Sequence, residues 1–526
     1  MHKIKSLILI ISLLLTSAIH AQDWNKTAQE GIKLLKQGST VKAITYLTEQ
    51  LTINKNDNQS RIILSHAYDF NGEPELAIKS LNEGLIANEA DLDLLWRLGE
   101  FHNRMAKDGP TVSYKNGTVS YSPSKDKVAE NEYKKKHLKE AINCYENALK
   151  IKPNTISFVF QLASTLALDK QNNKAIKLLE TLTQSVTDEP KFFIKLADVY
   201  LETESLKKAQ TSLENALILN PRSGEINIKL AQVFKAQGDN KLAGNHQKIG
   251  EFYSWVPEFI QLDFTEENYQ RYLITARVNK KDSQDSTKYE NDRVTFIQKL
   301  AEDKTVDSLA FLAALCSKHS DHGAVESIGF KALEDNPKIG LSHLLNLLNY
   351  HTSICTARQA AEGLAKLKAT EAVDRLIQLV PHDTRPLWTI NVAECLAQIN
   401  EKKAIPALLE FANISHTQEF PEDDPMNMSS GLLFARYRSI FALGAFKSEQ
   451  TEIQKELTKG LDNPQTSNAC LLALYRLTQN EKFLNELKTT IATDEHKSYL
   501  TWTLDLCKDP TFQKLSKDLE KITNKK

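Results

Sequence analysis

Small and large apolar residues recur along the first half of the chain with a fixed period. Alanines mark this period at six positions: Ala43, Ala77, Ala141, Ala175, Ala209 and Ala243. Successive alanines keep a 34-residue spacing, except that the spacing between Ala77 and Ala141 is 64, which is one period plus an insertion of 30. A period of this length is typical of a repeated helix pair that buries its apolar face by stacking on its neighbours.

Other positions keep the same register. A small residue stands twelve positions before each alanine, or before the insertion in the interrupted unit: Gly31, Ser65, Gly99, Ala163, Ala197 and Ala231. A larger apolar residue follows most of the alanines by four positions: Leu47, Leu81, Tyr145, Leu179 and Leu213. Small residues let two helices approach, and large ones fill the space between them. On these positions, residues 24 to about 250 resemble six tetratricopeptide repeats, which implies an all-α solenoid.

The insertion, at about residues 107–136, contains a β-hairpin pattern between the two helices of the third repeat. Asn116-Gly117 favours a two-residue turn, because both positions tolerate positive φ. A turn there pairs four apolar residues across two strands: Tyr114 with Val119, and Val112 with Tyr121. An isolated hairpin is marginally stable. We therefore expect its apolar face to pack on its own solenoid or, less favoured, on a bound partner.

A second, 32-residue period appears further along the chain. Five apolar positions of one segment recur in the next: Ala361, Leu364, Leu367, Ala372 and Leu376 are matched by Ala393, Leu396, Ile399, Ala404 and Leu408. These segments resemble HEAT-like repeats of the kind noted in phycobilisome lyases, which implies further helix pairs. Later units are indicated around Ile440 and Leu471, after extra chain that maps to residues 413–431.

The two periods divide the chain into regions. We predict a signal peptide over residues 1–21, a tetratricopeptide repeat domain over 22–252, a connecting region over 253–295 and a HEAT-like domain over 296–526. The connecting region includes a charged stretch without apolar periodicity. The predicted fold is an all-α solenoid of tetratricopeptide helix pairs followed by HEAT-like helix pairs, with a small β-hairpin insertion.

The N-terminus has the pattern of a secretory signal. Lys3 and Lys5 precede the apolar stretch Leu7–Leu15, and small residues lead to a cleavage site after Ala21. The apolar stretch is too short to span a bilayer, and no later segment approaches eighteen consecutive apolar residues. We expect an exported protein, periplasmic or secreted, that does not insert in a membrane once the signal is cleaved. The alternative is an anchor that is never removed.

The composition narrows the classes of function. The chain is 41% hydrophobic and 25% charged, which is typical of a folded soluble protein. Its net charge of −1 gives no electrostatic basis for binding nucleic acid. The six cysteines are scattered through apolar helical patterns and form no C-x-x-C motif. We interpret them as buried free thiols.

No pattern of a catalytic or cofactor site is present. The chain lacks the phosphate-binding, dinucleotide-binding, nucleophile-elbow, zinc-protease and haem-attachment motifs, so we expect no enzymatic activity and no cofactor. Cys316, His319 and His322 have three-residue spacing, but they converge on a metal only if a helix ends between them. We favour a helix end with surface histidines, and therefore no metal site.

The loop at residues 416–428 carries four acidic residues: Glu419, Glu422, Asp423 and Asp424. Their spacing does not match a calcium-binding loop. We interpret the segment as a solvated acidic loop, with contact to a partner as the alternative.

The resemblance to tetratricopeptide repeats implies that a peptide lies in the groove formed by the first helix of each repeat. Carrying this register over gives the predicted partner-binding residues His66, Asp69, Trp96, Asn103, Arg104, Phe160, Lys191, Ile194 and Asp198, flanked by Ile62 and Ile228. Trp96 and Arg104 have the residue types that most often anchor interfaces. An equal alternative for Trp96 is partial burial between repeats. The lysine and asparagine arrangement by which some relatives clamp a terminal carboxylate is not visible.

These features predict an exported, non-enzymatic scaffold that binds a protein or an extended peptide in its concave groove. Two alternatives come from other classes. One is a HEAT-like lyase or accessory factor acting on a prosthetic group, as the resemblance of the C-terminal third implies. The other is a cell-wall or carbohydrate-binding protein. The sequence leaves the oligomeric state open.

Overall fold

The structure of the protein is a computed structural model that describes residues 24–36, 39–109, 112–115, 118–121, 127–276, 286–318, 324–350, 353–383, 390–414, 428–493, 497–507 and 509–523. The predicted signal peptide and the acidic residues of the 416–428 loop lie outside these residues. The chain forms two compact units, residues 1–247 and 248–526, each of which is described by itself.

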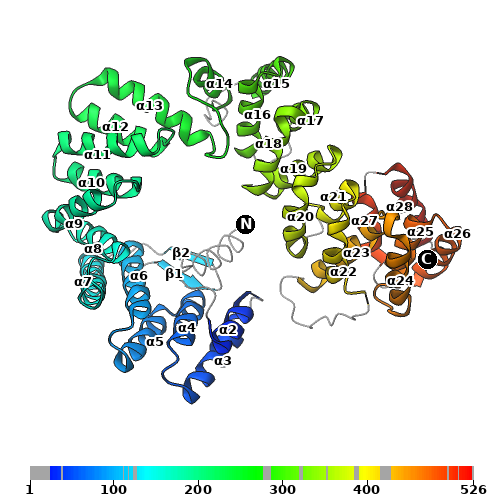
Figure 1. Cartoon of the computed structure of the whole chain (residues 1–526), viewed down its shortest axis with the longest axis horizontal. Coiled ribbons are helices and arrows are strands. Elements are labelled where there is room, and N and C mark those ends of the chain that lie inside the picture. The colour runs from blue at the N-terminus through cyan, green and yellow to red at the C-terminus, as the bar shows by residue number, and fades with distance from the viewer. Residues whose placement is uncertain are drawn as a thin grey trace. The chain divides into compact units, whose positions relative to one another are not determined.

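The first unit is a succession of helix pairs, coloured blue to green in Figure 1. Its helices are α2 (Lys26–Lys36), α3 (Thr40–Ile53), α4 (Asn58–Phe70), α5 (Pro74–Ala87), α6 (Leu92–Asp108), α7 (Lys127–Ile151), α8 (Ile156–Leu168), α9 (Asn172–Ser185), α10 (Pro190–Glu202), α11 (Leu206–Leu219), α12 (Gly224–Ala236) and α13 (Asn240–Trp255), the last of which crosses the unit boundary. Even-numbered helices are the first, and odd-numbered helices the second, of each pair. The predicted all-α solenoid is confirmed.

The 34-residue period describes the core of this unit. The alanines that mark the period are buried, from Ala43 in α3 to Ala243 in α13. A small and a large residue meet in the first repeat as predicted: a β-carbon on Gly31 would lie 2.8 Å from Cδ2 of Leu47, closer than real side chains allow. The small residue therefore sets how closely the two helices of a repeat approach.

A left-handed residue lies between the two helices of most repeats. It has positive φ at four equivalent positions: Gly72 (84°), Lys170 (62°), Glu204 (55°) and Gly238 (84°). This conformation reverses the chain within a few residues and suits glycine, because a β-carbon is strained there. Two repeats use glycine, whereas the other two accept the strain with Lys170 and Glu204.

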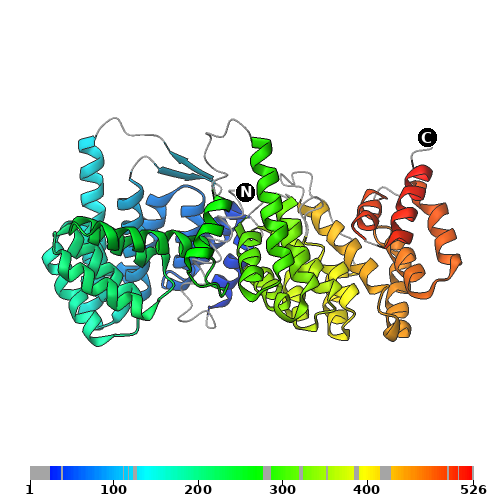
Figure 2. The same cartoon turned by 90° about the horizontal axis from the view of Figure 1, so that it is seen from above.

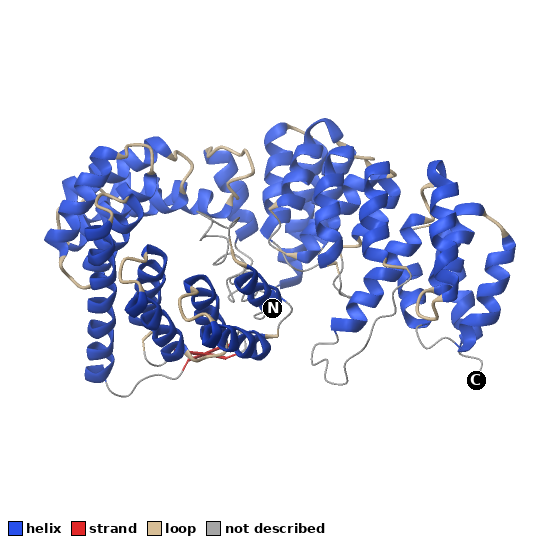
Figure 3. Ribbon diagram, turned by 60° about the horizontal axis from the view of Figure 1, so that its bottom comes forward, coloured by secondary structure: helices blue, strands red, loops and turns tan. Residues whose placement is uncertain are grey.

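The insertion in the third repeat contains two short strands, β1 (Val112–Lys115) and β2 (Thr118–Tyr121), drawn in red in Figure 3. They pair antiparallel, with Val112 opposite Tyr121 and Tyr114 opposite Val119, which is the register expected from a turn at Asn116-Gly117. The turn itself lies outside the described residues. The backbone of β1 lies beside α4 of the same unit. After the insertion, α7 is 25 residues long and extends beyond its neighbours (Figure 2).

The second unit is also helical. Its helices are α14 (Glu266–Ala276), α15 (Ser286–Asp303), α16 (Val306–Lys318), α17 (Ala324–Asp335), α18 (Pro337–Asn349), α19 (Ile354–Lys366), α20 (Val373–Leu379), α21 (Val392–Ile399), α22 (Ile405–Ala412), α23 (Met428–Leu443), α24 (Gln450–Lys459), α25 (Ser467–Thr478), α26 (Glu481–Thr490), α27 (Lys497–Leu506) and α28 (Pro510–Thr523). Short 3₁₀ turns join several of them: η2 (Thr370–Ala372), η3 (Val380–His382), η4 (Lys402–Ala404), η5 (Lys447–Glu449), η6 (Gly460–Asp462) and η7 (Ile491–Thr493).

The 32-residue period describes the middle of this unit. Of the ten apolar positions that carry the period, nine are buried and Leu367 is partly buried. Lys368 and Asn400, which lie one period apart, both have positive φ and reverse the chain between the helices of a pair. The region over 253–295, predicted as a connection, contributes α14 and most of α15 to this unit.

Buried ion pairs join distant parts of the second unit. The Asp383 carboxylate accepts hydrogen bonds from the backbone amides of Ile390 and Val392, both at 2.8 Å, and from the Arg438 guanidinium at 2.9 Å. Glu394 forms a two-pronged ion pair with Arg476, with both distances 2.9 Å. Because these side chains are largely buried, removing one partner would leave the other charge uncompensated and would lower the stability of the unit.

Within the described residues, every helix is too short or too polar to cross a membrane.

Candidate functional site

Three of the predicted groove residues meet in one hollow of the first unit. Trp96 of α6, Phe160 of α8 and Lys191 of α10 come from the first helices of three successive repeats. Together with neighbouring residues they line a volume of about 460 Å³: Thr155, Ile156, Ser157, Gln161 and Phe192. The 34-residue period brings equivalent helix faces side by side, so Trp96, Phe160 and Lys191 share this hollow although they are 31 to 95 positions apart in the sequence.

The walls of the hollow are aromatic. The Trp96 ring lies edge-on to Phe158, with ring centres 5.3 Å apart. The ring of Phe160 packs on the ring of Phe192, with ring centres 5.0 Å apart. Trp96 is half-buried, so it both packs between repeats and presents part of its surface to the hollow.

Lys191 places a positive charge at the edge of this hollow. Its ammonium lies 5.2 Å from the centre of the Phe192 ring and 3.1 Å from the Glu189 carboxylate. The site can therefore receive a bulky apolar group and still offer charge to a polar group beside it.

Other predicted groove residues form ion pairs between repeats. Arg104 of α6 binds both carboxylate oxygens of Asp69 of α4, at 2.5 and 2.6 Å. Asp198 of α10 pairs with Lys229 of α12 at 2.5 Å. These charges stabilise the packing of adjacent first helices and, being partly exposed, still contribute to the electrostatics of the groove.

Two predicted residues pack against neighbouring helices: Asn103 is buried, and His66 is half-buried. The Asn103 side chain is 8% exposed and donates to the Thr165 hydroxyl at 2.8 Å and to the Tyr145 hydroxyl at 3.2 Å. His66 packs against Phe101, and burial, with Arg97 and Arg104 nearby, lowers the pKa of His66 to about 3. Asn103 therefore joins helices in the interior and does not belong to the groove surface, whereas His66 keeps part of its surface exposed. Ile194 and Ile228 are half-buried, whereas Ile62 is buried.

Two residues of this surface were not predicted from the sequence. Phe192 forms a wall of the hollow although its register position predicts only core packing. Lys195 lies one helical turn beyond Lys191 and is half-buried. Its four-residue spacing from Lys191 was the available signal, because residues at that spacing share a helix face.

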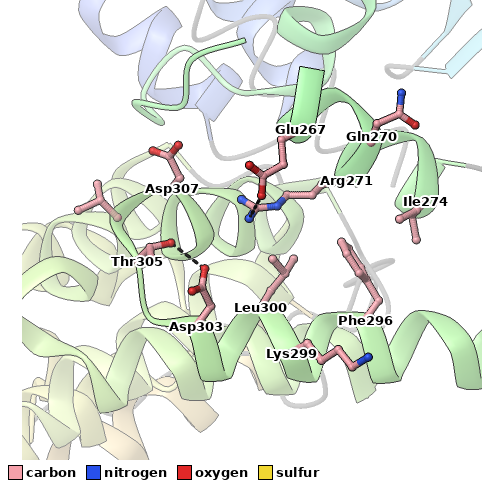
Figure 4. Close-up of a pocket in the computed structure, with 11 residues that line it drawn as sticks. Glu267, Gln270, Arg271, Ile274, Phe296, Lys299, Leu300, Asp303, Thr305 and Asp307 are labelled. Atoms are coloured by element: carbon pink, nitrogen blue, oxygen red, sulfur yellow. Dashed lines mark hydrogen bonds and ion pairs between the residues drawn. The ribbon is translucent and has the colours of Figure 1, made fainter. Parts of the chain in front are cut away.

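A larger hollow, of about 890 Å³, lies in the second unit between α14, α15 and the start of α16 (Figure 4). Four of its polar side chains form two pairs. Arg271 pairs with Glu267 at 2.6 Å, and Asp303 accepts from the hydroxyl of Thr305 at 2.9 Å. Phe296 is the one aromatic side chain among the residues that line this hollow, so we regard the aromatic hollow of the first unit as the better binding site.

The described residues hold no cluster of ligands suited to a metal ion. Cys316 is buried, and its thiol donates to the backbone carbonyl of Glu326 at 3.8 Å. Burial raises the pKa of this thiol far above its usual range. His319 and His322, its candidate partners, lie outside the described residues. All six cysteines are buried free thiols, as predicted.

Comparison with known proteins identifies both kinds of repeat. A model of the tetratricopeptide repeat matches residues 130–155, in α7 and the turn after it. A model of HEAT repeats matches residues 341–419, which include both segments of the 32-residue period. No curated protein matches the chain.

Solved structures similar to this chain include several tetratricopeptide proteins. The MamA protein of Desulfovibrio magneticus is 18% identical over 37% of this chain and 93% of its own, with a TM-score of 0.30. The protein TTC0263 of Thermus thermophilus is 19% identical over 40% of this chain and 97% of its own, with a TM-score of 0.28. PilF of Pseudomonas aeruginosa is 15% identical over 47% of this chain and 96% of its own, with a TM-score of 0.31. The matched repeat models and the two periods show that this chain contains tetratricopeptide repeats followed by HEAT repeats.

Proposed function

We propose that the protein is an exported scaffold whose first unit binds a segment of a partner protein in extended form along its first helices. The observation that carries this proposal is the hollow lined by Trp96, Phe160 and Lys191. A half-buried tryptophan in a concave site is a typical anchor of protein interfaces. Successive repeats supply equivalent faces, which suits a ligand that extends from one repeat to the next.

Non-enzymatic binding is part of this proposal. The ionisable side chains beside the hollow have local partners, such as Glu189 for Lys191 and Asp69 for Arg104. No nucleophile, base and orienting group converge there among the described residues, although catalysis would need such a set.

Photo-crosslinking from position 96 tests the binding site. A photoreactive amino acid replaces Trp96 in cells that produce the full chain, and captured proteins are identified by mass spectrometry. The matched control places the same group at Glu146, an exposed position on α7, the second helix of the same repeat. One dominant adduct at 96 that is absent at 146 supports the proposal. Equal capture at both positions, or none at 96, contradicts it.

Export is supported by Lys3, Lys5 and the apolar stretch Leu7–Leu15. Intact mass measurement of the protein from its producing cells tests this part of the proposal. A mature chain that begins at Gln22 and is found outside the cytoplasm agrees with export. A chain that retains Met1–Ala21 in the cytoplasm contradicts it.

A further inference from the structure

Three lysines of the first helices lie close enough for the charges of two of them to act on the third. They are Lys107 at the end of α6, Lys195 in α10 and Lys229 in α12. Lys195 is half-buried, and in the described part of the chain its ammonium forms no hydrogen bond or ion pair within 4 Å. A charged group withdrawn from water without a partner costs free energy, which a bound counter-charge would recover.

The acidic residues close to Lys195 are already engaged. Asp198 pairs with Lys229 at 2.5 Å, and Glu202 pairs with Lys170 at 3.0 Å. Burial lowers the pKa of Lys195, and the charges of Lys107 and Lys229 lower it further, against the opposing effect of Asp198 and Glu202. Lys229 has the carboxylates of Asp198 and Glu225 beside it, so Lys195 is the half-buried member of this group that has no counter-charge within 4 Å in the described part of the chain.

Lys195 lies at a defined distance from the hollow. Lys191, which lines the hollow, precedes Lys195 by four residues in the same helix. Four residues correspond to about 6 Å along a helix axis. An extended peptide advances by about 3.3 Å per residue and its side chains reach several Å to either side of its backbone, so side chains about two residues apart can reach both positions even when the peptide crosses α10.

We infer that the segment bound in this groove carries a bulky apolar side chain that fills the Trp96 hollow and an acidic side chain about two residues away that pairs with Lys195. This inference rests on the proposed function and specifies the chemistry of its partner. The acidic group is a side chain within the segment, so a free C-terminus is not required. Lys107, whose charge also acts on Lys195, adds long-range attraction for the same negative charge.

A library of random nine-residue peptides tests this inference, with acetylated N-termini and amidated C-termini so that only side chains carry charge. The full chain is presented with the library, and retained peptides are sequenced and resynthesised for affinity measurement. Lys195→Gln removes the unpaired charge. The matched control, Lys207→Gln, removes the same charge from an exposed position on α11, a second helix. Trp96→Leu tests the hollow.

We expect retained peptides to combine a large apolar residue with Asp or Glu two or three positions away. Lys195→Gln should weaken their binding about tenfold or more, as expected for a charge-assisted contact, while Lys207→Gln leaves it unchanged. Retained peptides without acidic residues that still depend on Trp96 would overturn the inference and leave the proposed function standing. Retention of no peptide, or of peptides insensitive to Trp96→Leu, would overturn both. Tighter binding of single-stranded nucleic acid than of any peptide would also overturn both.

Discussion

Gly99 of α6 lies directly against the ring of Tyr145 of α7, so that a β-carbon on Gly99 would sit 2.5 Å from Cε1 of the tyrosine. Tyr145 is fully buried and also receives a hydrogen bond from Asn103 at 3.2 Å. This contact joins the two helices that the hairpin insertion separates in the sequence. The third repeat therefore keeps the small-to-large packing of its neighbours in spite of the insertion.

Gly99→Ala should destabilise the first unit by about 1–3 kcal/mol, because the added methyl group overpacks a core contact. Gly244→Ala is the matched control in α13, where an added β-carbon meets nothing within 4 Å. There, alanine should raise stability by about 0.5–1 kcal/mol through its helix propensity. Urea denaturation followed by far-ultraviolet circular dichroism measures both. Equal effects of the two substitutions would contradict the packing interpretation.

Glu204→Gly should raise stability by about 0.5–1 kcal/mol, because Glu204 adopts φ of 55° in an exposed turn that glycine enters without strain. Asn215→Gly, at an exposed position inside α11, should lower stability by about 1 kcal/mol. Thermal unfolding of the two variants compares them directly. A loss of stability in Glu204→Gly would show that this turn is not strained by its side chain.

Asp383→Asn should destabilise the second unit by about 3–5 kcal/mol, because it leaves the buried Arg438 charge without its carboxylate. Asp374→Asn removes a carboxylate from an exposed pair with Lys403 and should cost less than about 1 kcal/mol. Limited proteolysis and urea denaturation of each variant report the difference. Similar costs at both positions would mean that burial of the Asp383 pair contributes little.

Stability should fall as the pH is lowered from about 7 to about 4. His102 and His137 face each other with their Nδ1 atoms 2.7 Å apart, and burial, with the charges of His137 and Lys136, lowers the pKa of His102 to about 4. The unfolded chain therefore takes up protons near pH 6.5, while the folded chain resists them until about pH 4. Within this window, each such histidine lowers the free energy of unfolding by about 1.4 kcal/mol for every pH unit of acidification. His66, whose pKa is about 3, adds to the same trend.

His102→Gln isolates one histidine in this window. An amide can accept or donate the hydrogen bond to His137 but does not titrate. The variant should lose less stability than the unaltered protein between pH 7 and pH 5, as measured by urea denaturation at each pH. An unchanged pH dependence would assign the effect to other groups.

The repeats could be predicted because their signals are local. Each helix pair fits within one period, and positions such as Ala43 and Leu47 contact residues of their own or the adjacent repeat. The hairpin register is equally local, since a two-residue turn fixes which residues face each other. Long-range contacts carried no such signal: Asp383 and Arg438 are 55 residues apart, and Glu394 and Arg476 are 82 apart.

The candidate site shows the same division. The sequence by itself determined which helix faces carry Trp96, Phe160 and Lys191, because a fixed period assigns each residue to a face. The tertiary structure alone decided that these three share a hollow and that the Asn103 side chain is hydrogen-bonded to Thr165 of the next repeat. It also decided that, among the described residues, Lys195 has no bonded partner while the acid Asp198 beside it does. The physical reason is that periodicity fixes the direction of a side chain, whereas burial and pairing depend on what neighbouring repeats place against it.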